Sequence, residues 1–270
     1  MGMGGHLMWT AVARNIRKQK NEICIPLDGF NFCRSDIFKN NPNFSFNGTL
    51  PLDLSLAETN YVKKDGERIE FSCPGKHAIE HALSFYGIKK DINLKCEMIL
   101  TAEEESNSNV IKNLLPQKYA CIEPHSKMSW SQARSYSFDK YQNIVNALRD
   151  KIKFVQIGSP GSKKLDNVIY TNGDLTFRET QSILSKANFF ISSEGGLVHL
   201  ANSCNTKSFV IFSSFHTYPE IFHYPENTMI DIALFRNEIG GYKNHPLHFE
   251  EVEKHDESII IELIKNENLF

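Results

Sequence analysis

The sequence predicts an α/β protein with a parallel, doubly wound sheet in its second half, and three observations carry this prediction. Short β-branched and aromatic runs alternate with stretches whose apolar residues recur at helical spacing. Residues 189–212 give a strand, a glycine turn, a helix and a strand in immediate succession. The 270 residues, 41% of them apolar, suffice for one large or two small domains with ample cores. Alternation at this spacing is typical of parallel sheets with helices on both faces.

Local patterns mark each element of the second half. Ser137 predicts the N-cap of a helix whose apolar residues share one face. Thr176 and Glu179 form a capping box, the reciprocal pattern that begins a helix. Strands are predicted at 119–123, 153–157, 168–170, 189–193 and 209–212, and further helices after Gly196 and at 256–266.

The first half has weaker patterns. A glycine turn at Gly4 and Gly5 is followed by a predicted helix that ends near Lys18. Such a turn normally follows a first strand, so we expect a short first unit in which this strand is absent, or else a sequence that starts late. The polar stretch 101–117 ends in Pro116-Gln117, and we place the boundary between domains 1–117 and 118–270 there. The other predicted elements are strands at 22–25 and 68–71, a loop at 28–60 and a helix at 76–86.

The candidate site is the turn that follows the strand at 189–193. Glu194 precedes two glycines, Gly195 and Gly196, and His199 follows three residues later. A helix N-terminus presents N–H groups and a positive dipole to a phosphate, and glycines allow positive φ or a close ligand. Neither the G-x-G-x-x-G nor the P-loop pattern is present, so a tight structural connection stays open as the alternative.

This turn resembles the hallmark of the ADP-heptose-type glycosyltransferases, the lipopolysaccharide heptosyltransferases of family 9. The family has an acidic residue, a small residue, Gly, two variable residues and His-Leu. Residues 194–201 match this order, with Glu194 for the usual Asp and Gly195 for Thr. The resemblance extends over roughly residues 119–225. Its other segments are 123–127, similar to the "hPgas" loop, 134–137, similar to "K-x-W-P", and 212–219, similar to "FG-x-T-x-P".

The resemblance implies a GT-B fold, in which two Rossmann-like domains face each other across a cleft and the second holds most of the nucleotide sugar. It implies an inverting transfer of a sugar, such as a heptose, from a nucleotide-diphosphate donor to a cell-surface glycan precursor. No metal or other cofactor is implied, because helix N-termini and cationic side chains hold the diphosphate, and an ADP-linked donor is favoured. The implied donor-binding residues are Ser126, Lys127, Arg134, Glu194, Gly195, Gly196, His199 and Thr217.

The catalytic base is less clearly marked. Gly4-Gly5-His6-Leu7 aligns with the family's Met-Gly-Asp turn, and Gly5 stands where the family has its catalytic Asp. A base must deprotonate the acceptor hydroxyl, and His6 is the nearest titratable side chain, with Asp28 as the weaker alternative. A catalytically inactive GT-B-like protein that binds a nucleotide sugar or acts as a scaffold therefore stays open as the second hypothesis.

A metal site is the third hypothesis. Residues 77–81 match H-x-x-E-H, a zinc-peptidase signature, and His77 and His81 would share one helix face. A separate apolar stripe on the same helix and the lack of an evident third ligand favour an ordinary surface helix instead.

Composition limits the other options. A net charge of −2 gives no reason to expect a nucleic-acid partner. The six cysteines include no C-x-x-C pair and are typical of reduced thiols in the cytoplasm. No apolar run is long enough to cross a bilayer and no signal-peptide pattern is present, so we expect a cytoplasmic protein, with peripheral contact at the inner face of the membrane left open.

Overall fold

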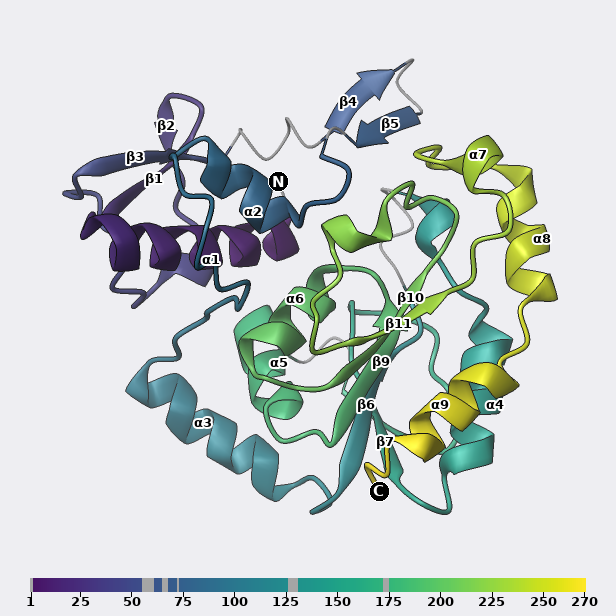
Figure 1. Cartoon of the computed structure of the whole chain (residues 1–270). Helices are drawn as coiled ribbons and strands as arrows, with labels where there is room; N and C mark the ends of the chain where they lie inside the picture. Colours follow the sequence, from purple (N-terminus) through teal and green to yellow (C-terminus); the bar gives the residue numbers. More distant parts are fainter. Residues whose placement is uncertain (1, 55–60, 65–67, 72, 126–130, 172–174) are drawn as a thin grey trace.

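The computed structural model describes residues 2–54, 61–64, 68–71, 73–125, 131–171 and 175–270. Figure 1 shows a larger α/β unit formed by the second half of the chain and a smaller unit formed by the first half beside it. Among the described residues, no helix combines the length and the apolar character that a membrane span requires.

A parallel six-stranded sheet forms the centre of the larger unit, in the order β11-β10-β9-β6-β7-β8. From β6 the strands follow one another toward one edge of the sheet as β7 and β8, and the next three, β9, β10 and β11, follow toward the other edge. The strand order therefore changes direction between β6 and β9. Ligands of open α/β sheets bind beside the carboxyl ends of the strands at such a switch point. The strands are β6 (Tyr119–Glu123), β7 (Lys153–Gln156), β8 (Val168–Tyr170), β9 (Phe189–Ser193), β10 (Ser208–Phe212) and β11 (Thr228–Asp231).

Helices cover both faces of this sheet, as Figure 1 shows. α4 (Phe138–Leu148) and α9 (Ser258–Asn266) enclose one apolar core, and α5 (Phe177–Leu184) and α6 (Gly196–Ser203) belong to the other. The Ser137 N-cap and the capping box at the start of α5 are both present. The prediction of a doubly wound α/β fold is therefore confirmed.

The smaller unit is short, as expected. Its sheet has three strands in the order β2-β1-β3, where β1 and β3 are parallel and β2 is antiparallel to β1. Helix α1 packs beside this sheet and directly follows Gly2. The elements are α1 (Met3–Lys20), β1 (Cys24–Asp28), β2 (Asn31–Phe32), β3 (Leu50–Asp53), the hairpin β4 (Tyr61–Lys64) and β5 (Arg68–Phe71), and the helices α2 (Ala78–Ser84) and α3 (Ala102–Asn113).

Two expectations for this unit were wrong, and one helix was not predicted. Gly4 and Gly5 lie in the first turn of α1 rather than in a loop. The stretch 28–60, expected as a loop, contains β2 and β3. The polar stretch before Pro116 contains α3, whose N-terminus has a capping box: the Glu104 backbone N–H donates to Thr101 Oγ1 at 3.1 Å, and the Thr101 N–H donates to Glu104 Oε2 at 2.7 Å. The boundary at 117 stays a prediction.

One apolar core connects the two units. Leu7, Val12 and Ile16 of α1 are fully buried in the same cluster as Leu200 of α6 and Ile183 of α5. An ion pair between α5 and α3 adds to this contact. Arg178 Nε donates to Glu104 Oε1 at 2.7 Å, and Arg178 Nη2 donates to Glu104 Oε2 at 2.8 Å. One face of the six-stranded sheet is thus covered partly by its own helices and partly by the first unit.

Candidate functional site

Two helix N-termini meet beside the switch point of the sheet. α6 begins at Gly196, directly after β9, and α1 begins at Met3. A Cβ added at Gly4 would lie 2.7 Å from His199 Cδ2 and 2.8 Å from Gly196 Cα, so the two helices touch through their backbones. Neither N-terminus has a side-chain cap. Their unpaired N–H groups and dipoles together favour an anion at this junction.

The two glycines of the hallmark do not have a special backbone conformation. Gly195 has an extended backbone (φ 176°) and Gly196 is the first residue of α6, so neither has the positive φ that the sequence allowed for. A Cβ at Gly196 would make only ordinary contacts, whereas a Cβ at Gly4 would collide with backbone. Close approach of α1 therefore explains the glycine at position 4.

Glu194 lies at the centre of a buried ionic cluster. Its side chain is almost fully buried, and Arg134 Nη2 donates to both Glu194 Oε2 and the Glu194 carbonyl oxygen at 2.5 Å. His216 Nε2 lies 3.1 Å from the same Oε2, and His199 Nε2 lies 3.7 Å from Oε1. The sequence thus predicted three members of this cluster, and the structure adds His216.

The cluster sets the protonation states of its members. Burial alone would raise the pKa of Glu194, but Arg134, His216 and His199 together lower it to about 2. Burial lowers the pKa of His199 to about 4 and also lowers that of His216. At neutral pH the cluster therefore holds one carboxylate, one guanidinium and two neutral imidazoles. Burial raises the pKa of nearby Glu123, at the end of β6, to about 8.

Arg134 lies on a short 3-10 turn, η3 (Gln132–Arg134), that is held from two sides. The Ser213 hydroxyl donates to the Ala133 carbonyl oxygen at 2.5 Å, and the Ala133 N–H donates to the Lys243 carbonyl oxygen at 3.0 Å. The backbone contacts fix the position from which the Arg134 side chain reaches Glu194.

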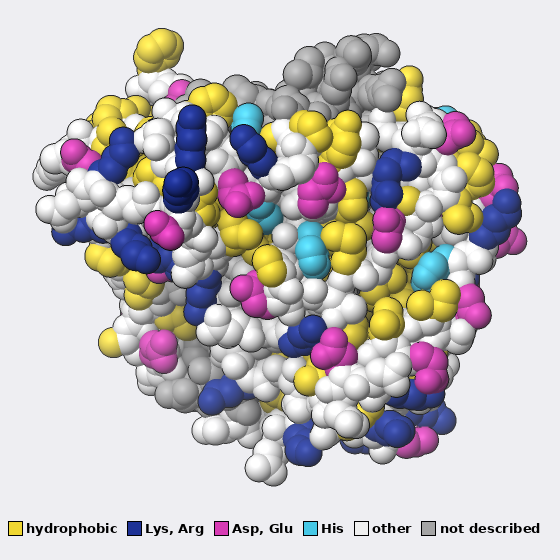
Figure 2. Space-filling view, viewed as in Figure 1, with side chains coloured by type: hydrophobic (Ala, Val, Ile, Leu, Met, Phe, Trp, Pro, Cys, Tyr) yellow, Lys and Arg dark blue, Asp and Glu magenta, His cyan; other side chains and the backbone are white. Residues whose placement is uncertain are grey.

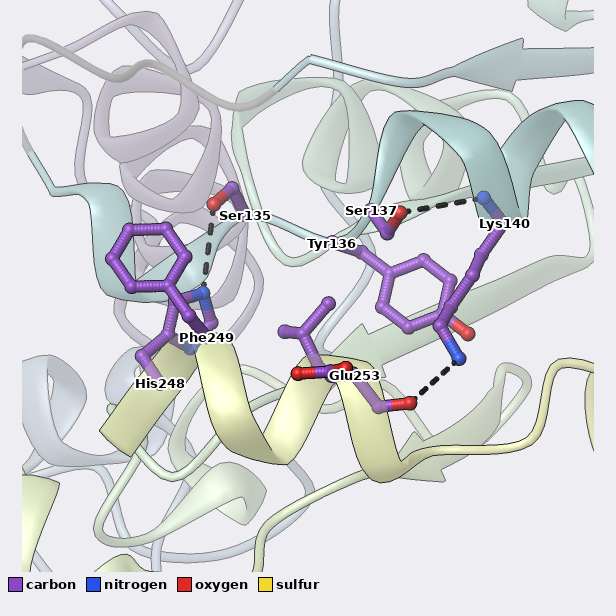
Figure 3. A pocket seen from close by; sticks show the side chains of 8 residues that line it. Ser135, Tyr136, Ser137, Lys140, His248, Phe249 and Glu253 are labelled. Carbon is purple, nitrogen blue, oxygen red and sulfur yellow. Dashed lines mark hydrogen bonds between the residues drawn. The ribbon is translucent and has the colours of Figure 1, made fainter. Parts of the chain in front are cut away.

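A surface groove of about 360 Å³ flanks the segment after this turn. Figure 3 shows it between the segment that leads into α4 and the helix α8 (Pro246–Lys254). His248 Nε2 contacts Ser135 Oγ at 3.5 Å on this side, and His248 Nδ1 pairs with the buried Glu251 at 3.2 Å. Glu251 also accepts from the Ser214 N–H at 3.0 Å, so α8 ties the loop after β10 to the segment after η3.

A second hydrogen-bond chain crosses between the two units. Tyr224 Oη lies 2.7 Å from His199 Nδ1 and 3.2 Å from Cys96 Sγ. The ring of His77, at the start of α2, packs on Tyr224 with centroids 4.9 Å apart. Figure 2 shows histidine side chains on this face of the molecule, among interspersed acidic and basic residues. Residues of the first unit thus help to orient the imidazole of His199.

The two candidate bases lie in the first unit. His6 is half-buried in α1; its Nδ1 lies 2.8 Å from Ser35 Oγ, and its Nε2 lies 4.0 Å from Cys33 Sγ. Burial lowers the pKa of His6, while Asp28 at the exposed end of β1 raises it less. The structure therefore brings His6 and Asp28 to one edge of the small sheet.

Three other predicted residues are placed as follows. Thr217 lies in the loop after β10, beside His216, and faces Gly240. Ser126 and Lys127 lie outside the described residues. Sequence reasoning missed His216 and Tyr224. His216 could have been found as a histidine just past the carboxyl end of a strand that neighbours β9.

The H-x-x-E-H motif builds a helix cap. His77 Nδ1 accepts from the Ile79 N–H at 3.1 Å, and Glu80 Oε2 accepts from the His77 N–H at 2.9 Å. The motif thus supplies both halves of the capping box of α2. Among the described residues, no three His, Cys, Asp or Glu side chains gather closely enough to hold a metal ion.

We expect His77→Ala to destabilise the fold by at least about 1 kcal/mol, because an N-cap and a buried ring are both lost. His81→Ala removes the other histidine of the motif and should change stability by less than about 0.5 kcal/mol. Urea unfolding of both variants measures this difference. Equal losses accompanied by stoichiometric zinc binding to the wild type would contradict the capping role.

Neither a protein-family model nor a curated protein sequence significantly matches the chain. Solved structures do match. A family 9 glycosyltransferase from Veillonella parvula is 10% identical with a TM-score of 0.69, and the match covers 98% of this chain and 94% of that one. A second match is TibC, an iron-containing dodecameric heptosyltransferase from enterotoxigenic E. coli, in complex with ADP-D-β-D-heptose. It is 15% identical with a TM-score of 0.70, and the match covers 100% of this chain and 75% of that one.

E. coli ADP-heptose lipopolysaccharide heptosyltransferase II matches less fully, with 11% identity and a TM-score of 0.51 over 70% of this chain and 61% of that one. At these low identities, all three matches show a similar arrangement of helices and strands. The motifs of residues 119–225 had indicated the same family from sequence alone. This chain therefore has the GT-B fold of family 9 glycosyltransferases.

Proposed function

We propose that this protein is a metal-independent, inverting glycosyltransferase that uses a nucleotide-diphosphate sugar. The observation that carries the proposal is the meeting of two uncapped helix N-termini next to Arg134, at the switch point of a doubly wound sheet. This arrangement supplies fixed positive charge without a metal ion. The proposed acceptor is a cell-surface glycan precursor, and the proposed location is the cytoplasm, including the inner membrane face.

The residues of the junction would hold the leaving diphosphate. The backbone N–H groups of Gly195, Gly196 and the N-terminus of α6 would donate hydrogen bonds to its oxygens, with Arg134 and His199 beside them. Thr217, Ser126 and Lys127 stay donor-binding residues by resemblance alone. TibC is described in complex with ADP-D-β-D-heptose, and for this chain an ADP-linked sugar such as a heptose is the donor that we propose.

His6 is the proposed base. Burial lowers its pKa, which keeps the imidazole neutral and able to accept a proton at neutral pH. The acceptor oxygen, losing its proton to His6, would form a bond to the anomeric carbon. The bond from that carbon to the phosphate oxygen would break, and the nucleoside diphosphate would leave with the electron pair. Asp28 is the alternative base at the same edge.

A thermal-shift panel of ADP, UDP, GDP and CMP, first without metal and then with magnesium, tests this site. We expect one nucleotide to raise the melting temperature without metal, because ligand at about a hundred times its Kd stabilises a protein by about 2.7 kcal/mol. Glu194→Ala and His199→Ala should lose the shift, whereas Lys265→Ala on the surface of α9 should keep it.

Each outcome of the panel decides something. No shift with any nucleotide would refute the donor site. A second outcome is that wild type and His6→Ala both show the shift and neither turns over the matching nucleotide sugar. This outcome would favour the inactive protein that binds a nucleotide sugar or acts as a scaffold. Gly5 in place of the usual Asp also favours that protein.

A further inference from the structure

The loop after β10 carries a histidine that the family resemblance does not assign, and this histidine reaches Glu194. His216 Nε2 lies 3.1 Å from Glu194 Oε2, the same oxygen that accepts from Arg134 Nη2. Two donors from separate elements, η3 and the β10 loop, thus meet on one carboxylate oxygen. Neither element could place that oxygen alone, because the carboxylate of a glutamate rotates about its own bonds.

The ring of His216 is held firmly. It is 1% exposed and packs edge-on against Phe212 and Phe215, with both pairs of centroids 5.1 Å apart. The backbone of His216 is also held: its carbonyl oxygen accepts from Arg236 Nε at 3.0 Å, and its backbone N–H donates to the Ser213 carbonyl oxygen at 3.1 Å. The side chain therefore presents Nε2 to Glu194 from a fixed position.

The charges around Glu194 determine where the proton of His216 lies. The groups that face the Glu194 carboxylate are Arg134 from η3, His199 from α6, His216 from the β10 loop and Glu123 from β6. Burial lowers the pKa of His216, so its imidazole is neutral at pH 7. The one ring proton is on Nε2, facing the carboxylate, and Nδ1 carries a lone pair that has no partner among the described residues.

We propose that His216 is a positioning residue for the donor site: its Nε2–H fixes the Glu194 carboxylate, and through it the Arg134 guanidinium, beside the N-terminus of α6. The part of this inference that concerns the nucleotide rests on the function proposed above. The part that concerns Glu194 and Arg134 rests on the contacts alone. Loss of the Nε2 donor would leave a buried carboxylate with one fewer hydrogen bond and a guanidinium with a mobile partner.

Two substitutions separate the donor from the ring. His216→Gln keeps an amide N–H donor near the position of Nε2, whereas His216→Phe keeps an aromatic ring and removes both nitrogens. His248→Gln is the control for the loss of a buried histidine, because His248 is equally buried but pairs with Glu251 at 3.2 Å and not with Glu194.

The first measurement needs no ligand. In protein with ¹³C-labelled glutamate carboxyls, the Glu194 signal, assigned by its absence in Glu194→Gln, is followed from pH 8 to pH 4. We expect no titration in wild type, His216→Gln or His248→Gln, because the pKa of Glu194 is about 2. In His216→Phe the midpoint should rise toward the ordinary value of about 4.3 or above it, since a hydrogen bond to the charged form is lost.

The second measurement is the Kd for ADP by calorimetry. His216→Phe should bind ADP at least about tenfold more weakly, the factor that a hydrogen bond to a charged group is worth, and His216→Gln should stay within about threefold of wild type. A Glu194 signal that does not move in folded His216→Phe overturns the inference. So does a His216→Gln variant that is as impaired as His216→Phe, because the ring rather than the donor would then matter. If wild type itself does not bind ADP, the ADP-linked donor fails, while the carboxyl titration still decides the role of His216.

Discussion

Arg134→Met is expected to destabilise the fold by about 3–5 kcal/mol, the usual effect of removing one partner of a buried ion pair. Methionine retains much of the apolar stem but leaves the buried Glu194 carboxylate with two neutral imidazoles as its remaining partners in the cluster. Urea unfolding at pH 7 measures the loss. Lys265→Met, which breaks the exposed pair with Glu262, should change stability by less than about 1 kcal/mol.

The pH dependence provides a second check on the same pair. The pKa of Glu194 is about 2 in the fold and about 4.3 in an unfolded chain, so the fold gains stability from this group above about pH 4.3 and loses it as pH falls toward 2. The gap between wild type and Arg134→Met should therefore narrow as pH falls from 5 to 3. A gap that stays constant over this range would mean that Arg134 acts through packing instead.

Gly4→Ala is expected to destabilise the fold by about 1–3 kcal/mol, although alanine is the better helix former by about 1 kcal/mol. The added methyl would lie 2.8 Å from Gly196 Cα, and a backbone atom cannot give way by changing a rotamer. The helices α1 and α6 must separate instead. Thermal unfolding measures the effect, and the ADP shift should fall with it.

Gly2→Ala is the matched control, because a Cβ at that position meets nothing within 4 Å. It should leave stability within about 0.5 kcal/mol of wild type. If Gly4→Ala proves as stable as Gly2→Ala, the close contact of the two N-termini is not maintained in solution, and the anion site proposed there loses its basis.

The sequence was sufficient for five of the six strands of the second half, because each of them is a short apolar run, and for α4 and α5, which begin at side-chain caps. It did not predict β11 at the edge of the sheet. It was less informative for the first half. Helix α3 has a capping box at Thr101 and Glu104, but its polar surface hides the apolar periodicity on which the prediction relied. Local patterns fail there because contacts with α5, far along the chain, stabilise the helix.

The site was predictable only in part for a related reason. Glu194 and His199 lie within one motif, and Arg134 lies in a second. His216 and Tyr224 come from loops whose conformations depend on α8 and on the first unit. The role of Gly4 was also hidden, since a glycine near a chain end suggests a turn until its neighbour across the fold is known.

The apolar core that runs from α1 into α5 and α6 limits how this protein can be divided. A fragment that begins at β6 would keep the whole six-stranded sheet and the hallmark turn, yet it would expose to water the faces of α5 and α6 that Leu7, Val12 and Ile16 now cover. Exposed apolar faces of this kind promote aggregation. The second half is therefore not a module that can be expressed or exchanged alone, and exchanges between relatives should keep α1 together with its own α6.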